Sequence, residues 1–200
     1  SDDFLKAELH PDTEIIIKEE SDRLQVLKPF AEWNKKEMNN LKILLKAEGK
    51  CTTDHVSPAG PWLKYRGHLE NISQNMYSGA LNAFTKTNGE AIDLINDKTD
   101  NIYEVAKTYK ENNIDWIAVA DENYGEGSSR EHAAMEPRFM GCKIIIAKSF
   151  ARIAQTNLKK QGILPLIFKD KSDYDKIEAN DTISTICLLY TSPSPRDLST

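Results

Sequence analysis

Three short apolar runs alternate with two helix-like stretches between residues 116 and 168, and this alternation constrains the fold more than any other feature of the chain. We expect strands at 116–120, 143–147 and 164–168, because short runs rich in Ile, Val and Leu are typical of buried strands. A helix near 129–136, stopped by Pro137, and a helix near 151–160, ended by Gly162, would connect them. Strands that alternate with helices in this way indicate βαβ units and a mostly parallel sheet, and therefore an α/β fold.

The rest of the chain suggests a division into three parts. A strand at 41–47 and a helix at 102–112 extend the regular region, so we predict one domain over residues 41–186. Residues 1–40 are charged and loosely patterned, which suggests a connection from a missing preceding domain. Residues 187–200 contain two Ser-Pro pairs without apolar periodicity and are interpreted as a disordered or non-native tail. Because the chain does not begin with Met, we expect a fragment or a processed protein.

The segment from Asp121 to His132, Asp-Glu-Asn-Tyr-Gly-Glu-Gly-Ser-Ser-Arg-Glu-His, forms the first strand-to-helix turn. Ligands of parallel α/β sheets bind beyond the carboxyl ends of the strands, where this turn lies. Its two glycines allow close backbone approach, the helix start favours an anion, and the Arg130 guanidinium suits a carboxylate or phosphate. The Ser128 and Ser129 hydroxyls would contact the same ligand. These features favour a binding site for a small anion.

A purely structural interpretation of this turn stays open. Ser128-x-x-Glu131 has the spacing of a capping box, which stabilises a helix without any ligand. The spacing also differs from the P-loop and from the dinucleotide motif G-x-G-x-x-G, so a nucleotide is not expected.

Two upstream loops carry further candidate residues. Asp54 and His55 lie in the loop 51–60, where a carboxylate beside an imidazole could act in proton transfer. Adjacent loop residues seldom pair with each other, so taken alone an Asx turn with a surface histidine is the favoured interpretation. Arg66 lies in a loop bracketed by glycines and could reach an anion or pair with a surface acid. The histidines have no metal-ligand spacing, so we assign no metal to this chain.

Composition excludes several functional classes. The net charge of −5 and the lack of a basic stripe argue against nucleic acid binding, and no apolar run is long enough to cross a membrane. Cys51, Cys142 and Cys187 are odd in number and far apart, which predicts free thiols in a reducing compartment and no disulfide framework.

Three of these segments, taken together, resemble the aconitase family, and its mitochondrial branch in particular. They are residues 50–69, with Cys-Thr-Thr-Asp-His-Val-Ser-Pro-Ala-Gly, residues 120–134, with Gly-Glu-Gly-Ser-Ser-Arg, and residues 157–162, Asn-Leu-Lys-Lys-Gln-Gly. The likeness runs from about residue 21 to about residue 186. It implies the final domain of that family, a three-layer β/β/α swivelling domain.

The resemblance also implies an activity. Aconitases are hydro-lyases that interconvert citrate and isocitrate through cis-aconitate in the tricarboxylic acid cycle, using a [4Fe–4S] cluster. By this likeness Ser128 is the base, Asp54 belongs to the catalytic set, and Arg66, Ser129 and Arg130 bind substrate carboxylates. The likeness further implies the mitochondrial matrix as location and a monomer when complete, with missing N-terminal domains as partners.

The chain also departs from the family pattern. The cluster cysteines and active-site histidines of the family belong to earlier domains, so cluster ligands are not expected on this chain and the fragment alone is expected to be inactive. The family motif Phe-Ala-Arg-Ile-His-Glu-Thr-Asn becomes Phe-Ala-Arg-Ile-Ala-Gln-Thr-Asn, with Ala154 and Gln155 in place of a polar pair. Two other functions stay open: a separate small subunit of a related dehydratase, and an RNA-binding module like the cytosolic relative.

Overall fold

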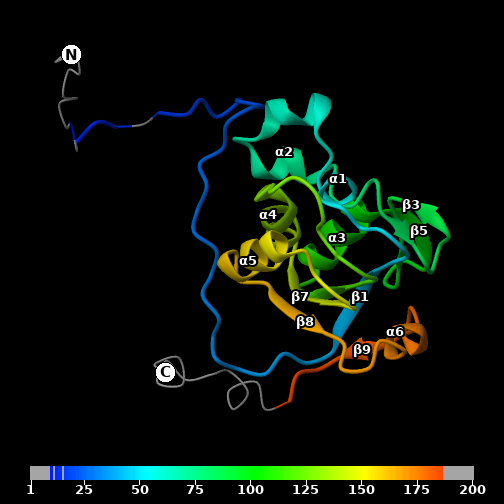
Figure 1. Ribbon diagram of the computed structural model, residues 1–200. Coiled ribbons are helices and arrows are strands. Elements are labelled where there is room, and N and C mark those ends of the chain that lie inside the picture. The colour runs from blue at the N-terminus through cyan, green and yellow to red at the C-terminus, as the bar shows by residue number, and fades with distance from the viewer. Residues whose placement is uncertain (1–9, 11, 15, 187–200) are drawn as a thin grey trace, which may run out of the picture.

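The computed structural model describes residues 10, 12–14 and 16–186, and their fold is built on a seven-stranded sheet (Figure 1). Six strands follow the order β3-β2-β1-β6-β7-β8, and β9 pairs with β1 outside this path. The strands of the sheet are β1 (Leu41–Ala47), β2 (Leu81–Asn82), β3 (Thr87–Asn88), β6 (Trp116–Ala120), β7 (Cys142–Ala147), β8 (Leu164–Ile167) and β9 (Thr182–Ile183). The four longest strands, β1, β6, β7 and β8, are parallel to one another. The predicted α/β class with a mostly parallel sheet is therefore confirmed.

The central strands carry apolar side chains on both faces, which explains why they appear in the sequence as unbroken apolar runs. In β6, Trp116, Ala118 and Ala120 belong to one buried cluster. Ile117 and Val119, which alternate with them, belong to a second cluster on the opposite face. The sheet is thus buried on both sides.

Helices cover the two faces unequally. The helices are α1 (Thr53–Val56), η1 (Gly60–Tyr65), α2 (Leu69–Ser73), α3 (Ile102–Glu111), α4 (His132–Phe139), α5 (Arg152–Lys160) and α6 (Asp173–Lys176). α3, α4 and α5 supply buried residues to the first cluster, whereas α6 and β9 lie against the second. No helix among the described residues is long and apolar enough to span a membrane.

The helix after β6 differs from its prediction. It begins at His132 instead of near residue 129, and Pro137 lies inside it instead of stopping it. Proline removes only one helical hydrogen bond donor, and here the buried Glu136 and Pro137 hold the turn against the core. The helix therefore continues, and the Met140 N–H donates to the Glu136 carbonyl at 3.0 Å.

Short polar hairpins between α2 and α3 were not predicted. β2 pairs with β3, and β4 (Glu90–Asp93) pairs with β5 (Lys98–Asn101) as a separate two-stranded sheet. This hairpin contacts α3 and forms the small second sheet of the domain.

Residues 16–40 run as an extended segment over the surface. Figure 1 shows this segment passing α2 and then following the outer side of the domain until it enters β1. Leu24 forms an isolated bridge with Gly67, and the Ala31 carbonyl accepts from Arg138 Nη2 at 2.8 Å. The tail predicted at 187–200, with Cys187, lies outside the described residues.

Candidate functional site

Three loops that follow the carboxyl ends of β1, β6 and β7 are joined by main-chain hydrogen bonds. The Gly125 N–H donates to the Cys51 carbonyl at 2.7 Å, and the Thr53 N–H donates to the Glu126 carbonyl at 2.9 Å. The Tyr124 N–H donates to the Ser149 carbonyl at 2.9 Å. These bonds fix the loop 121–131 between its two neighbours, at the sheet edge where the ligand site was predicted.

The glycines of this loop are required by its geometry. Gly125 has a φ of +75°, and a Cβ atom there would lie 2.3 Å from the Ala154 Cβ in α5. No side chain fits this contact without displacing the helix. Gly127 has a φ of +108°, and a Cβ atom there would lie 3.3 Å from the Thr53 Oγ1. Both positions are in the left-handed region that favours glycine.

Arg130 and Asp54 are brought together from separate loops. Arg130 Nη1 forms an ion pair with Asp54 Oδ1 and donates to the Ser57 carbonyl at 3.0 Å. The Asp54 side chain is 67% exposed, whereas that of Arg130 is 21% exposed. The guanidinium is therefore anchored on one side and keeps further N–H groups with which to bind an anion.

The imidazole of His55 takes no part in this pair. Its Nδ1 accepts the Thr52 N–H at 3.1 Å, across the first turn of α1. Asp54 lies in that short helix instead of in an irregular loop, and its carboxylate pairs with Arg130. Asp54 and His55 therefore bond to different partners.

Ser128 and Ser129 are exposed and precede the helix α4. The N-cap of α4 is Glu131, and no side-chain hydrogen bond caps this helix. The capping-box interpretation of Ser128 is therefore wrong. The expected anion site on the first turn of α4 is also displaced, because the helix starts later and begins beside the carboxyl of Glu131.

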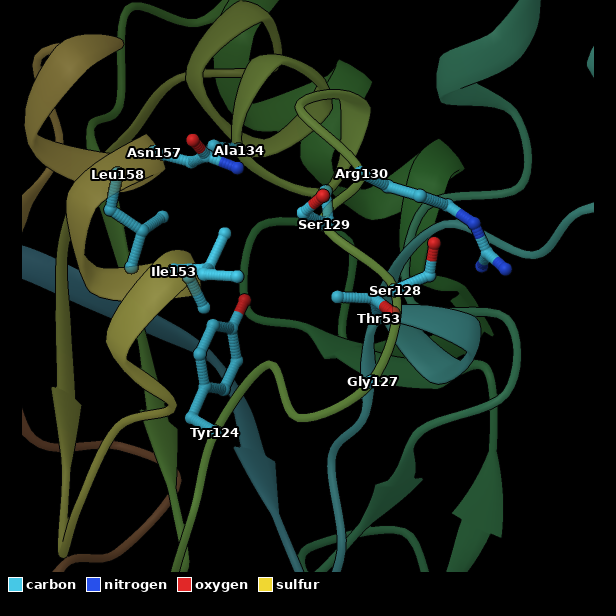
Figure 2. Close-up of a pocket in the computed structure, with 12 residues that line it drawn as sticks. Thr53, Tyr124, Gly127, Ser128, Ser129, Arg130, Ala134, Ile153, Asn157 and Leu158 are labelled. Carbon is cyan, nitrogen blue, oxygen red and sulfur yellow. The ribbon is translucent and has the colours of Figure 1, made fainter.

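Beside the contact between Gly125 and Ala154, a small pocket that is partly open to solvent lies between this loop and α5. In Figure 2, Ser129 and Tyr124 lie on opposite sides of the pocket, and the Arg130 side chain leads away from it. The Tyr124 hydroxyl is hydrogen-bonded to that of the buried Tyr77 at 2.7 Å, and Arg130 pairs with Asp54. The pocket wall on the α5 side is formed by Ile153, Ala154, Asn157 and Leu158. The arrangement presents a polar loop opposite the mainly apolar face of α5.

Arg66 approaches the site through its main chain. It caps the end of η1, and its carbonyl lies 3.0 Å from His132 Nε2 at the start of α4. Its exposed side chain donates from Nε to the Leu63 carbonyl at 3.3 Å. The structure thus places Arg66 next to the helix start without bonding its guanidinium to the Asp54–Arg130 pair.

Two buried polar residues beside the site were missed by the sequence analysis. Ser57, 2% exposed, donates from Oγ to Oε1 of Glu136, 0% exposed, at 2.7 Å. Burial raises the pKa of the Glu136 carboxyl well above its usual range, partly opposed by the Ser57 hydrogen bond and the Arg130 charge. The sequence feature that could have identified Glu136 is an acidic residue on the apolar face of a predicted helix.

The described cysteines do not fit an iron–sulfur cluster. Burial raises the pKa of the Cys51 thiol to about 12, and it also raises the pKa of the Cys142 thiol. Cluster ligands must be thiolates, and three or four are usual. Within the described ranges no group of three His, Cys, Asp or Glu residues could hold a metal. The described residues therefore do not fit an iron–sulfur cluster as its ligands.

Known proteins resemble most of this chain in sequence. A family model described as the aconitase C-terminal domain matches residues 41–171. Over 182 residues, 90% of the chain, the sequence is 58% identical to a probable mitochondrial aconitate hydratase of Dictyostelium discoideum, of which the match covers 23%. It is 53% identical over 180 residues to the mitochondrial aconitate hydratase of Saccharomyces cerevisiae, again covering 23% of that protein.

The chain therefore spans about a quarter of the length of these relatives. Among solved structures, a 3-isopropylmalate dehydratase from Methanocaldococcus jannaschii aligns with 73% of the chain and 68% of its own, at 23% identity and a TM-score of 0.45.

Proposed function

Because the chain belongs to the aconitase C-terminal domain family, we propose that it is the C-terminal part of a mitochondrial aconitate hydratase. Such an enzyme is a hydro-lyase that interconverts citrate and isocitrate through cis-aconitate in the tricarboxylic acid cycle. The observation that carries the proposal is the 58% identity, over 90% of the chain, to a protein of that name. The relatives do not favour the separate small subunit or the RNA-binding module.

In this proposal Ser128 is the base that removes the substrate proton. A serine hydroxyl is a weak acid, so its alkoxide needs nearby positive charge. Arg130, two residues further on, supplies a guanidinium that Asp54 and the Ser57 carbonyl already orient. Asp54 thus belongs to the catalytic set as the partner that directs this cation.

Substrate carboxylates would be bound by Arg130, Ser129 and Arg66. A tricarboxylate needs several cationic or hydroxyl donors, and arginine supplies two parallel N–H groups to each carboxylate. Ser129 is exposed and faces the pocket (Figure 2), and Arg66 is exposed beside the start of α4. Support for Arg66 comes from the family likeness, because its guanidinium bonds elsewhere in this structure.

The [4Fe–4S] cluster would be held by the preceding domains, which lie outside residues 41–186. The cluster supplies Lewis-acid chemistry in the family, and the described residues do not fit it as ligands. Residues 1–40 would then be the connection from those domains, and the mitochondrial matrix the location. A complete protein of this kind is expected to be a monomer.

A domain exchange tests the proposal. Residues 41–171 replace the matching segment of the S. cerevisiae mitochondrial aconitate hydratase, and citrate-to-isocitrate conversion is measured on the purified chimera. We expect turnover in the chimera and its loss in the same protein with Ser128→Ala. Lys107→Ala, at an exposed position of α3 within the exchanged segment, serves as the control. A correctly folded, cluster-loaded chimera without activity would contradict the proposal.

A further inference from the structure

A fully buried carboxyl group lies behind the candidate site and is not explained by packing alone. Glu136 is 0% exposed on the inner face of α4, among Ala133, Ala134 and Pro137. Its Oε1 accepts the Ser57 hydroxyl at 2.7 Å, and within the described residues Oε2 has no hydrogen-bond partner. Burying a carboxyl is costly, so an apolar residue would pack this helix face at a lower cost.

The contacts of Ser57 lead from Glu136 to Arg130. Ser57 is the residue after α1, and its N–H donates to the Thr53 carbonyl at 2.9 Å. Its hydroxyl donates to Glu136, and its carbonyl accepts Arg130 Nη1 at 3.0 Å. Ser57 is thus held at its N–H and at its side chain, and these two bonds fix the direction of the carbonyl that receives the guanidinium.

Pro58, the next residue, cannot contribute an N–H to hold this segment. Its carbonyl accepts from the buried Asn75 Nδ2 at 3.0 Å, which fixes the following peptide. The side-chain bond to Glu136 therefore acts together with the Ser57 N–H bond to Thr53 in holding the peptide that carries the Ser57 carbonyl. Without it, the buried hydroxyl would lose its acceptor and the carbonyl could turn.

We propose that Glu136 is a positioning residue for substrate binding, which acts through Ser57 to hold the Arg130 guanidinium beside Asp54 and next to Ser128. This inference rests on the proposed function of Arg130 as a carboxylate ligand. The raised pKa of Glu136 agrees with it, because a neutral carboxyl holds Ser57 without burying a full charge. The amide of glutamine would offer the same acceptor oxygen in nearly the same volume.

Kinetics of the chimera described above test the proposal. Glu136→Met fills the space but removes the acceptor, and we expect the KM for citrate to rise about tenfold or more, with a smaller change in kcat. Glu136→Gln should restore most of the affinity. In an Arg130→Lys background, Glu136→Met should add little to KM, because both changes act on the same contact. Ile43→Val, on the opposite face of the sheet, is the control for lost packing.

A purely structural role predicts other results. Glu136→Met would then change the melting temperature only and leave the KM of the folded protein unchanged, as Ile43→Val does, and this outcome would overturn the proposal. Full additivity with Arg130→Lys, or a Gln variant as impaired as the Met variant, would also overturn it. If Glu136→Met does not fold, Ser57→Ala is used instead, and an unchanged KM for citrate in Ser57→Ala would likewise overturn the proposal.

A second measurement separates this inference from the proposed function. The ¹⁵N–¹H signals of the Arg130 guanidinium are recorded in the 200-residue chain without substrate. We expect distinct signals, in slow exchange with one another, in the parent and in Glu136→Gln, and averaged signals in Glu136→Met. An inactive parent chimera would contradict the proposed function only. Arg130 guanidinium signals that are the same in the parent and in Glu136→Met would contradict the positioning role, even in an active enzyme.

Discussion

Both contacts that orient the Arg130 side chain use the same nitrogen, Nη1. The guanidinium is planar, so fixing one nitrogen also sets the direction of the remaining donors. A lysine could keep one of these contacts as a point charge, but it could not keep an anchor and also present two parallel N–H groups to a substrate. The residue type at this position is therefore decided by geometry as well as by charge.

We expect Arg130→Lys to raise the KM for citrate about tenfold or more and to change kcat less, because a bidentate carboxylate contact is lost. Steady-state kinetics on the chimera check this. Arg152→Lys, an exposed arginine at the start of α5 within the exchanged segment, is the matched control and should keep the parent KM. An unchanged KM in Arg130→Lys would remove this residue from substrate binding.

Ser128→Ala should lower kcat about 10²–10⁴-fold and affect KM little, since a base acts only on the way to the transition state. The melting temperature should stay close to that of the parent, because Ser128 is not the N-cap of α4. If Ser128 capped the helix, its replacement by Ala would instead lower the free energy of unfolding by about 1 kcal/mol and leave turnover intact. Measuring kcat, KM and the melting temperature of one variant therefore distinguishes the two roles; a normal kcat would exclude Ser128 as the base.

At the scale of elements, the loop 121–131 and the helix α5 fit together only because a residue without a side chain lies between them. Gly125 combines a left-handed backbone with direct contact to Ala154. The main-chain bond from Gly125 to Cys51 then carries this constraint to the loop after β1. One glycine thus sets the spacing between three elements.

Gly125→Ala should lower the free energy of unfolding by roughly 2–5 kcal/mol, adding a left-handed backbone cost to a steric clash. Gly49→Ala is a matched control, because Gly49 has a φ of +69° but no atom within 4 Å of the added Cβ. It should cost only about 1–2 kcal/mol. Urea denaturation of both variants gives the comparison, and equal losses would show that the contact with α5 is not tight.

Some elements could be predicted from sequence and others could not, for physical reasons. β6 was predicted at its observed bounds because both of its faces are buried and every residue in it is apolar. β5, with the sequence Lys-Thr-Asp-Asn, has no apolar pattern and exists because it pairs with β4. The start of α4 was misplaced because a capping pattern at Ser128 is a local signal, whereas the observed start depends on packing of the buried face.

At the scale of the whole molecule, the site depends on contacts that no local pattern contains. The sequence indicated Asp54 and Arg130 separately, and the family likeness suggested their roles, but their ion pair exists only because β1 and β6 are neighbours in the sheet. The hydrogen bonds that link Glu136 to Ser57 and Ser57 to Arg130 were not predicted, since a glutamate in a helix is usually exposed. Burial of such a group is a property of the complete fold.

Burial of the cysteines in the complete fold also determines where an iron–sulfur cluster can bind. We expect the 200-residue chain, incubated anaerobically with iron, sulfide and a reductant, to acquire no visible charge-transfer absorption and no turnover of citrate. Cys51 lies in the loop after β1 and Cys142 opens β7, each fully buried in the helix-side core and with a raised thiol pKa. Cys187 lies outside the described residues, and one further thiol does not complete a set of three or four. The intact S. cerevisiae relative, treated in the same way, is the positive control. A stoichiometric cluster on the chain alone would mean that its core opens to release both buried thiols, and it would contradict the assignment of the cluster to preceding domains.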